Sequence, residues 1–404
     1  MSRATAVIGS AFGDCGKGLV TDYCAAANPK AVVVRYNGGA QAGHTVCTPD
    51  GRRHVFSHFG AGSFVGNPTY LSRFFIVNPR VWAVEAGELR RDLGHVPALY
   101  VDNDAIVTTP YDMALNVEIE RSRGAHRHGS CGIGVNETVT RFYENVSTTI
   151  LAGDLYFHQR VLSAMDAIRK DYVPRRLSAM GVTPSREMET LLQDDTAMFH
   201  FAECLCTMFC KNAIMVDSDF LRGQDLIFEG AQGLLLDQDH HYFPHVTRSK
   251  TGMHNVRRIM DEVGGVDHVD AIYVTRTYMT RHGAGPFRTE DPTLSYHDDT
   301  NAEGEFQGKL RFGHLDTFLL FESINRDLKD AGPVRAMLAV THVDQIKGTV
   351  PVETSWGPEL MCAEDLVSYL FTSNRMERGL VSHGPCRTDV EHWHQPVHRA
   401  TAAA

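Results

Sequence analysis

The sequence predicts an α/β fold, with a large mixed, mostly parallel sheet flanked by helices. Two observations lead to this prediction. The first 35 residues run in the order strand, glycine-rich loop, helix, strand, and further short apolar segments recur along the 404 residues. Such a unit builds a parallel sheet, because the helix crosses back over one face between two strands that point the same way.

The first unit is defined by its apolar pattern. Residues 4–10 form a short apolar run that ends in a glycine-rich turn, which predicts a buried strand. Apolar side chains then recur at helical spacing from Leu19 to Ala27, and Asn28-Pro29 ends the helix. Residues 31–35 form a second apolar run, again followed by glycines, and we expect it to be the next strand.

Later elements follow from the same criteria. Further buried strands are expected at residues 98–102, 225–229, 270–275 and 335–341. Residues of about 155–212 show helical periodicity and predict a helical insertion, whereas residues 289–312 are polar and predict a long surface loop. Because neither a repeat nor a linker separates these segments, we expect residues 1–404 to form a single domain.

Composition excludes several classes of protein. The net charge is −10, so nucleic acid and anionic membranes are not expected partners. We find no run of the roughly 18 apolar residues that a membrane span requires. The nine cysteines are scattered and form no CxxC pair, which favours a reduced, cytoplasmic setting.

The loop between the first strand and helix predicts a phosphate site. Its sequence is GDCGKG, residues 13–18, in which the glycines let backbone N–H groups converge and Lys17 supplies a positive charge. The loop departs from a Walker A motif, since Ala11 and Gly18 replace its first Gly and its Ser or Thr. Asp14 is then the nearby carboxylate that can hold Mg²⁺, although an ordinary tight turn is the alternative interpretation.

A second glycine-rich loop, residues 37–45, follows the second strand. In a parallel sheet, ligands bind outside the carboxyl ends of the strands, so we expect both loops to face one crevice. His44 would then lie near the phosphates as a donor or general acid.

Five segments together resemble the adenylosuccinate synthetase family: GDCGKG, VRYNGGAQAGHT, FEGAQGLLLDQDHHYFPHVT, TRHGAGPFRTE and SHGPCRTD. They occur in the family's order over nearly the whole chain. The resemblance implies that family's P-loop-related fold and a homodimer. It also implies its reaction, in which GTP, L-aspartate and IMP give adenylosuccinate, GDP and phosphate.

The resemblance also implies roles for individual residues. Asp14 corresponds to the catalytic base and Mg²⁺ ligand, His44 to the general acid, and the Gly43 carbonyl to a second Mg²⁺ ligand. Lys17 and Gln232 complete the catalytic group. The nucleoside triphosphate is expected to contact Gly13, Asp14, Cys15, Gly16, Lys17, Gly18, Leu19, Gly43, His44, Thr45, His342, Asp344, Ser382 and Gly384.

The acceptor and the amino acid are assigned to further residues by the same resemblance. The acceptor nucleotide is expected at Asp14, Gln41, Ser130, Gln232 and Thr247, with Arg141 resembling an arginine that the second subunit supplies. Lys309 and Arg311 are the candidates for binding the aspartate carboxylates, and only arginine can do so bidentately.

The guanine base is expected at Thr341-His342-Val343-Asp344, which resembles the family's TKxD motif. An aspartate there can accept hydrogen bonds from N1–H and the 2-amino group of guanine, which adenine cannot offer. His342 replaces the motif's lysine, and Ser382-His383-Gly384-Pro385 resembles the second wall of the base site. A simple helix cap is the alternative role for Asp344.

Departures from the family pattern leave the acceptor open. Cys15, Leu19 and Ala40-Gln41 replace other family residues, and the aspartate loop is reduced to Gln307-Gly308-Lys309-Leu310-Arg311. A phage-type branch, 2-aminoadenylosuccinate synthase, acts on dGMP. This chain resembles that branch in the Lys17-Gly18-Leu19 ending of its first loop and in the C-terminal pattern Gly384-Pro385…Asp389-Val390-Glu391. That branch commonly has serine at the position of Asp14.

Three functions therefore remain open. The first is a GTP-dependent ligase that acts on IMP, and the second is the same reaction on GMP or dGMP with ATP or GTP. The third is a nucleotide-binding protein without catalytic activity. The presence of both a candidate base and a candidate acid, Asp14 and His44, argues against the third.

Overall fold

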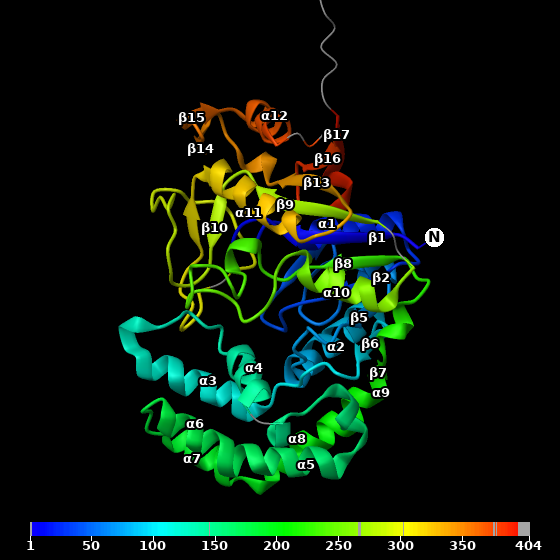
Figure 1. Cartoon of the computed structure of the whole chain (residues 1–404), viewed down its shortest axis with the longest axis vertical. Helices are drawn as coiled ribbons and strands as arrows, with labels where there is room; N and C mark the ends of the chain where they lie inside the picture. The colour runs from blue at the N-terminus through cyan, green and yellow to red at the C-terminus, as the bar shows by residue number, and fades with distance from the viewer. Residues whose placement is uncertain are drawn as a thin grey trace, which may run out of the picture.

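A ten-stranded sheet forms the centre of the protein in the computed structural model, which describes residues 2–144, 146–265, 268–301, 303–374, 376 and 378–394. The strand order is β17-β16-β13-β9-β1-β8-β2-β5-β6-β7, and every neighbouring pair is parallel except β16 and β17. The predicted fold class is thus confirmed. Figure 1 shows the sheet between two groups of helices.

The strands have the following bounds: β1 Ala4–Gly9, β2 Val32–Arg35, β3 His44–Cys47, β4 Arg53–Phe56, β5 Thr69–Leu71, β6 Leu99–Asp102, β7 Ala213–Val216, β8 Leu226–Glu229, β9 Val269–Arg276, β10 Met279–Arg281, β11 Arg311–Gly313, β12 Leu315–Asp316, β13 Val334–Thr341, β14 Val350–Thr354, β15 Gly357–Met361, β16 Arg378–Ser382 and β17 Val390–His394. All six strands expected from the sequence are present, as β1, β2, β6, β8, β9 and β13.

The α-helices have the following bounds: α1 Lys17–Ala27, α2 Pro79–Leu93, α3 Pro110–Arg123, α4 Val135–Glu144, α5 His158–Ala167, α6 Val173–Ala179, α7 Arg186–Gln193, α8 Asp195–Glu203, α9 Cys210–Asn212, α10 Met253–Val263, α11 Thr317–Lys329 and α12 Ala363–Ser373. No helix of the described residues has the length and apolar character to cross a membrane.

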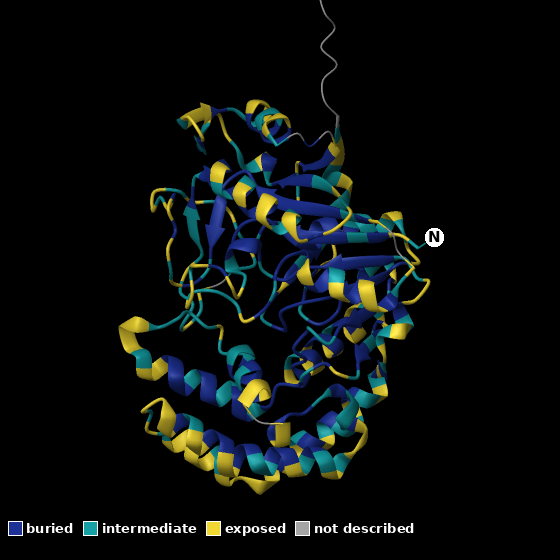
Figure 2. Ribbon diagram, viewed as in Figure 1, coloured by how far each residue is buried: buried dark blue, intermediate teal, exposed yellow. Residues whose placement is uncertain are grey.

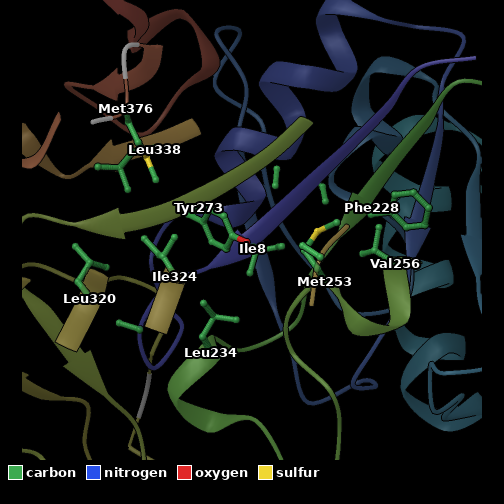
Figure 3. Close-up of a cluster of buried hydrophobic side chains, with 14 of the residues drawn as sticks. Ile8, Phe228, Leu234, Met253, Val256, Tyr273, Leu320, Ile324, Leu338 and Met376 are labelled. Atoms are coloured by element: carbon green, nitrogen blue, oxygen red, sulfur yellow. The ribbon is translucent and has the colours of Figure 1, made fainter. Parts of the chain in front are cut away.

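The two faces of β1 are buried against different helices. Ala4, Ala6 and Ile8 belong to the core cluster that contains side chains of α10 and α11. Val7, on the opposite face, packs in the cluster that contains α1. This alternation follows from the two-residue period of a strand, and burial on both faces explains why the central strands are continuously apolar. Figure 3 shows the first of these clusters, and Figure 2 shows the buried central strands.

The helical segment α5–α9 and the turn between residues 180 and 185 correspond to the expected insertion at about 155–212. We propose that it interrupts one continuous domain, because β6 and β7, which flank residues 103–212, pair directly in the sheet. The predicted domain of 1–404 also includes residues 395–404, which lie outside the described part of the chain.

The segment 289–312 is largely irregular, as expected, and joins β10 to its antiparallel partner β11. Its start lies beside β11, through the isolated pairing of Glu290 with Gly313. Part of this segment approaches the carboxyl ends of the parallel strands, where most of the predicted site residues lie.

Candidate functional site

A cavity of about 1220 Å³ opens at the carboxyl ends of the central strands. The loops after β1, β2, β8, β9, β13 and β16 line one side of it, and residues of α3 and α4 line the other. Strands β8 and β9 flank β1 in the sheet, so chain segments far apart in sequence meet here. This is the edge at which parallel α/β sheets bind their ligands.

Most of the predicted site residues line this one cavity: Gly13, Asp14, Cys15, Gly16, Lys17, Gly18, Leu19, Gln41, Gly43, His44, Thr45, Ser130, Gln232, Thr247, His342, Asp344 and Gly384. Three of them, Asp14, Gln232 and His342, are the non-glycine residues with positive φ in the described part of the chain. A strained backbone at three cavity residues is typical of a functional site, because the surrounding fold must enforce it.

The first loop is tightly packed against its neighbours. Gly13 and Gly16 have φ of 105° and 84°, and a Cβ on Gly16 would lie 3.0 Å from Cγ2 of Thr341. The Thr341 hydroxyl donates to the Cys15 carbonyl at 3.0 Å. The loop therefore enters α1 with a fixed shape, and the N-terminus of that helix adds a positive dipole end.

Lys17 is a buried cation without a counter-ion. It is 4% exposed, and no carboxylate in the described chain forms an ion pair with it. Its Nζ has only a 3.8 Å contact with the Cys15 sulfur. Burying an unpaired ammonium is costly unless a bound anion compensates, so the position fits a polyphosphate.

Asp14 presents a free carboxylate to the same space. Its backbone carbonyl accepts a hydrogen bond from Nε of Arg276, whereas its carboxylate has no hydrogen-bond partner among the described residues. The carbonyl of Gly43, also on the cavity wall, likewise accepts no hydrogen bond from the described residues. Oxygen donors of this kind fit Mg²⁺, which is commonly bound by one or two carboxylates together with substrate phosphates.

His44 is oriented by a buried carboxylate. Its Nδ1 lies 2.6 Å from Oε1 of Glu229, and its Nε2 is buried without a partner. Burial lowers the pKa of His44, although Glu229 opposes the shift. Burial alone would raise the pKa of Glu229, but His44, Arg35 and the Ala61 N–H hold it below its usual value, so we treat Glu229 as ionised. It therefore accepts from Nδ1–H, which leaves Nε2 for a ligand.

Two amide side chains are also unpaired. Both amide atoms of Gln41, and Oε1 of Gln232, are buried without hydrogen-bond partners. The two amide ends lie against the same backbone, since a Cβ on Gly38 would be 3.2 Å from Gln232 Oε1 and 3.6 Å from Gln41 Nε2. Unpaired buried amides are costly, and they are suited to bind the edge of a nucleobase.

Ser130 and Thr247 line another part of the wall. The Ser130 hydroxyl donates to Asn116 at 2.6 Å, and its backbone N–H donates to Glu120 at 3.3 Å. Helix α3, which carries Asn116 and Glu120, thus positions the loop of residues 128–132. Thr247 is held by its own N–H, which donates to the Leu236 carbonyl at 2.9 Å.

The candidate base site is formed by the loops after β13 and β16. Asp344 is exposed on the cavity wall. Burial, with a contribution from Arg276, lowers the pKa of His342 to about 3, so its ring is neutral. Ser382 does not line the cavity, but its hydroxyl donates to the Gly384 carbonyl at 2.7 Å and so shapes the loop that does.

Besides Ser382, three predicted residues are not brought to the cavity. Arg141 is 1% exposed and forms a bidentate ion pair with Asp112, so it is not available to the cavity of its own chain in this arrangement. Arg311 forms a bidentate pair with Glu290. Lys309 is exposed, 3.9 Å from Glu303. Asp112 and Glu290, which the sequence did not single out, hold the two arginines, and Arg141 was expected to serve the cavity of a second subunit rather than its own.

Two positioning residues, Glu229 and Arg276, were not predicted from the sequence. Glu229, which orients His44, ends a strand that was expected, but its role depends on β8 lying beside β2. Arg276 donates to the Asp14 carbonyl and pairs with Asp298 at 3.2 Å, which holds residues 297–301 at the cavity wall. Its position at the end of a strand, next to the expected crevice, was the available indication.

Similar proteins are found over most of the chain. The family model described as adenylosuccinate synthetase matches residues 6–365. The adenylosuccinate synthetase of Legionella pneumophila (strain Paris) is 30% identical over 357 residues, which cover 86% of this chain and 78% of the relative. That of Thermoplasma volcanium is 27% identical over 358 residues, which cover 85% of this chain and 76% of the relative.

Solved structures share the fold. Fully ligated adenylosuccinate synthetase from Plasmodium falciparum superposes with a TM-score of 0.72 at 17% identity, over 96% of this chain and 99% of the other. Cyanophage S-2L succinoaminodeoxyadenylate synthetase (PurZ), bound to dGMP and to dATP as an energy donor, superposes with a TM-score of 0.59 at 14% identity, over 98% and 96%. At these identities, the likeness concerns the fold alone.

Proposed function

The chain belongs to the adenylosuccinate synthetase family, and on this premise we propose that it condenses L-aspartate with the 6-oxo position of IMP, driven by GTP. Family membership makes it a carbon–nitrogen ligase of purine biosynthesis. The identity of the acceptor, the use of GTP and the roles of individual residues are our proposals.

One observation carries the proposal. A free carboxylate on Asp14, an unpaired ammonium on Lys17 and the unpartnered Nε2 of His44 line one cavity. A carboxylate can remove a proton, whereas the ammonium and the imidazole can bind and protonate an anion. A protein that only binds nucleotides has no need of both groups, which argues against the non-catalytic alternative.

The chemistry follows from these positions. The 6-oxygen of the purine is a poor nucleophile, so Asp14 removes the N1 proton and produces a 6-oxyanion. This oxygen attacks the γ-phosphorus of the triphosphate, the bond to the β–γ bridging oxygen breaks, and the nucleoside diphosphate leaves. Lys17 and Nε2 of His44 stabilise the charge that develops on the phosphoryl oxygens. The aspartate amine then attacks C6, and phosphate leaves with the original 6-oxygen.

The described residues fit a magnesium ion. The Asp14 carboxylate and the Gly43 carbonyl would hold it, and the remaining ligands would come from the substrates and water. When bound, the ion neutralises phosphate charge. Asp14 can serve both as base and as ligand because it has two oxygens, and neither is occupied by a protein donor in the described chain.

The donor preference is assigned to Asp344. Its carboxylate is exposed on the cavity wall, where it can accept two hydrogen bonds from guanine. Adenine has no donors at the corresponding positions, so the proposed donor is GTP rather than ATP. The neutral ring of His342 beside it would pack on the base without adding charge.

The competing acceptor is GMP or dGMP. The retained Asp14 favours IMP, whereas the Lys17-Gly18-Leu19 ending of the first loop favours the phage-type branch. The two purines differ by a 2-amino group beside N1, so the acceptor depends on which cavity groups face C2. The unpaired amides of Gln41 and Gln232 are the candidates.

We also propose a homodimer in the cytoplasm. Five large apolar side chains between residues 142 and 157 are exposed, and Tyr143 among them also lines the cavity: Phe142, Tyr143, Val146, Tyr156 and Phe157. Exposed apolar surface favours a partner. The scattered cysteines are typical of a reducing compartment.

A competition assay tests the proposal. Purified protein receives equal IMP and dGMP with excess aspartate, Mg²⁺, GTP and ATP, and products are identified by mass. Adenylosuccinate as the main product supports the proposal. The 2-amino deoxy product would show that the acceptor is dGMP and not IMP. No succinylated product would favour the non-catalytic alternative. Asp14→Asn should abolish turnover while nucleotide binding stays detectable, and full activity would remove Asp14 from the role of base.

A further inference from the structure

Three histidines gather at one corner of the cavity. His128, His245 and His282 all line it, from three separate loops. The rings of His128 and His245 are 5.9 Å apart, centroid to centroid. The loop that follows His282 lies against His245 and against Gly129, the residue after His128: a Cβ on Gly129 would lie 3.1 Å from Gly283 Cα, and one on Gly285 would lie 2.6 Å from His245 Cβ.

The polar atoms of this corner lack protein partners. Nδ1 of His245 and both ring nitrogens of His282 are buried without hydrogen bonds. The backbone N–H groups of Gly283, Ala284 and Gly285 donate to no acceptor in the described chain. The buried, unpaired ring nitrogens are costly and call for a hydrogen-bonding ligand, and the N–H groups of the exposed Ala284 and its two neighbours are available to the same ligand.

Two arginines explain why the N–H groups are free. Arg311 donates to the carbonyls of Gly283 and Gly285, and Arg281 donates to those of Ala284 and Pro286. With these carbonyls turned toward the arginines, the N–H groups of the same loop are left for another acceptor. Successive N–H groups in such a turn form a concave site that favours anions.

The surrounding charge also favours an anion. Arg281 is 1% exposed and has no carboxylate partner in the described chain, whereas Arg311 is neutralised by Glu290.

On the side of His128, Glu120 accepts from the Gly129 and Ser130 N–H groups and pairs with Arg123. Arg248 is exposed on the wall beside His245. Arg127, on the same loop, lies over Phe306 and donates to the Glu305 carbonyl.

The hydroxyls expected at the acceptor phosphate lie beside the histidines. Ser130 is two residues from His128, and Thr247 is two residues from His245, all on the cavity wall. Arg141, which was expected to come from a second subunit, pairs with Asp112 in its own chain. Within one chain, the corner therefore consists of hydroxyls and imidazoles.

We propose that His128, His245 and His282, with the N–H groups of residues 283–285, form an oxyanion site that binds the 5′-phosphate of the acceptor nucleotide. This inference rests on the proposed function. A carboxylate of aspartate has the same oxyanion chemistry and is the other possible source of the group. The positions of Ser130 and Thr247 favour the phosphate.

A site made of histidines makes acceptor binding depend on pH. Burial, Arg123 and His245 lower the pKa of His128, so its imidazole is neutral near pH 7 in the free protein. A phosphate dianion favours the protonated ring, so binding takes up protons. Affinity should therefore increase by up to about tenfold per bound proton for each unit that pH falls between 8.5 and 6.5. Below about pH 6 the phosphate itself becomes protonated, and the gain ends.

Calorimetric titration of the full chain tests the inference. IMP, dGMP and the matching nucleosides, inosine and 2′-deoxyguanosine, are titrated between pH 6.5 and 8.5 into the unaltered protein, His245→Asn and His282→Asn. His254→Asn, on an exposed position of α10 outside the cavity, is the matched control. Each variant is first checked for an unchanged melting temperature and GTP affinity, which excludes misfolding.

We expect each site variant to bind the monophosphate about tenfold more weakly at pH 6.5, with a flatter pH dependence. Nucleoside affinity should be the same in all four proteins, because the nucleoside lacks the phosphate; a purely structural role would weaken both. If monophosphate binding has the same pH dependence in the variants and in the unaltered protein, the inference is overturned but the proposed function is not. The same holds if the KM for aspartate rises while monophosphate affinity is unchanged, which would assign the corner to a carboxylate of aspartate. Failure of the unaltered protein to bind either monophosphate would overturn the proposed function as well.

Discussion

Asp327 on α11 is a half-buried acid whose ionisation opposes folding. Its Oδ1 accepts from the Met253 N–H at 2.9 Å, at the start of α10, and its Oδ2 accepts from the Tyr273 hydroxyl at 2.8 Å. Burial raises the pKa of Asp327 to about 6, and Asp237 and Asp330 add to the shift while the two hydrogen bonds oppose it. Asp327→Asn removes the charge and keeps an oxygen for the Met253 N–H.

The sign and size of the effect follow from the raised pKa. The folded state favours the protonated acid, so its contribution to stability is complete below about pH 4 and is lost as pH rises through about 6. The shift of about two pKa units corresponds to at most about 3 kcal/mol. Because Asp327 is only partly shielded from solvent, we expect Asp327→Asn to stabilise the protein by about half of this at pH 8. At pH 4.5 we expect little difference.

Urea unfolding at several pH values between 4.5 and 8 measures this effect as the shift of the midpoint at constant slope. Asp261→Asn is the matched control, since Asp261 is 67% exposed on α10 and pairs with Arg257 at 3.2 Å. It should change stability by less than about 0.5 kcal/mol at every pH. A gain in Asp327→Asn that is the same at pH 4.5 and 8, or a loss at pH 8, would refute the reasoning.

Three further predictions concern the active site. Lys17→Met should raise the KM for the triphosphate by about 10- to 100-fold while the melting temperature of the ligand-free protein does not fall, because the buried ammonium has no partner; an unchanged KM with lower stability would contradict this. Glu229→Gln should lower kcat by about 100-fold, because His44 loses the carboxylate that orients its ring. The affinity for the triphosphate, measured by calorimetry, should stay within about threefold. An unchanged kcat would show that Glu229 does not act through His44. Asp344→Asn should raise the KM for GTP by about tenfold or more but leave that for ATP unchanged, and equal effects in steady-state assays would exclude guanine readout.

The central strands could be predicted because they are buried on both faces. Residues 225–229 and 335–341 are continuous apolar runs, and the structure has β8 and β13 there within one residue. Strand β5, Thr69–Leu71, is only three residues long, which is too short for a period to emerge. The order of the strands was not predictable, since it depends on contacts between segments more than 200 residues apart, such as β1 with β8.

Some residues of the candidate site could be predicted from the sequence and others could not. Asp14, Lys17 and His44 lie in loops whose glycines and place after a strand indicate a ligand, and the structure brings all three to one cavity. Arg141 and Arg311 were assigned by family position, but Asp112 and Glu290 hold them in ion pairs. No local sequence pattern predicts these carboxylate partners, because the paired residues are brought together only by the tertiary fold.

The transfer of the 6-oxygen of the acceptor to phosphate tests the central claim most directly. The protein would be given IMP or dGMP labelled with ¹⁸O at C6, together with aspartate, Mg²⁺ and GTP, and the released phosphate would be analysed by mass. Attack by the 6-oxyanion predicts one ¹⁸O atom in each phosphate formed with the succinylated product. Unlabelled phosphate accompanying that product would contradict the 6-phosphoryl route and the role of Asp14 as its base.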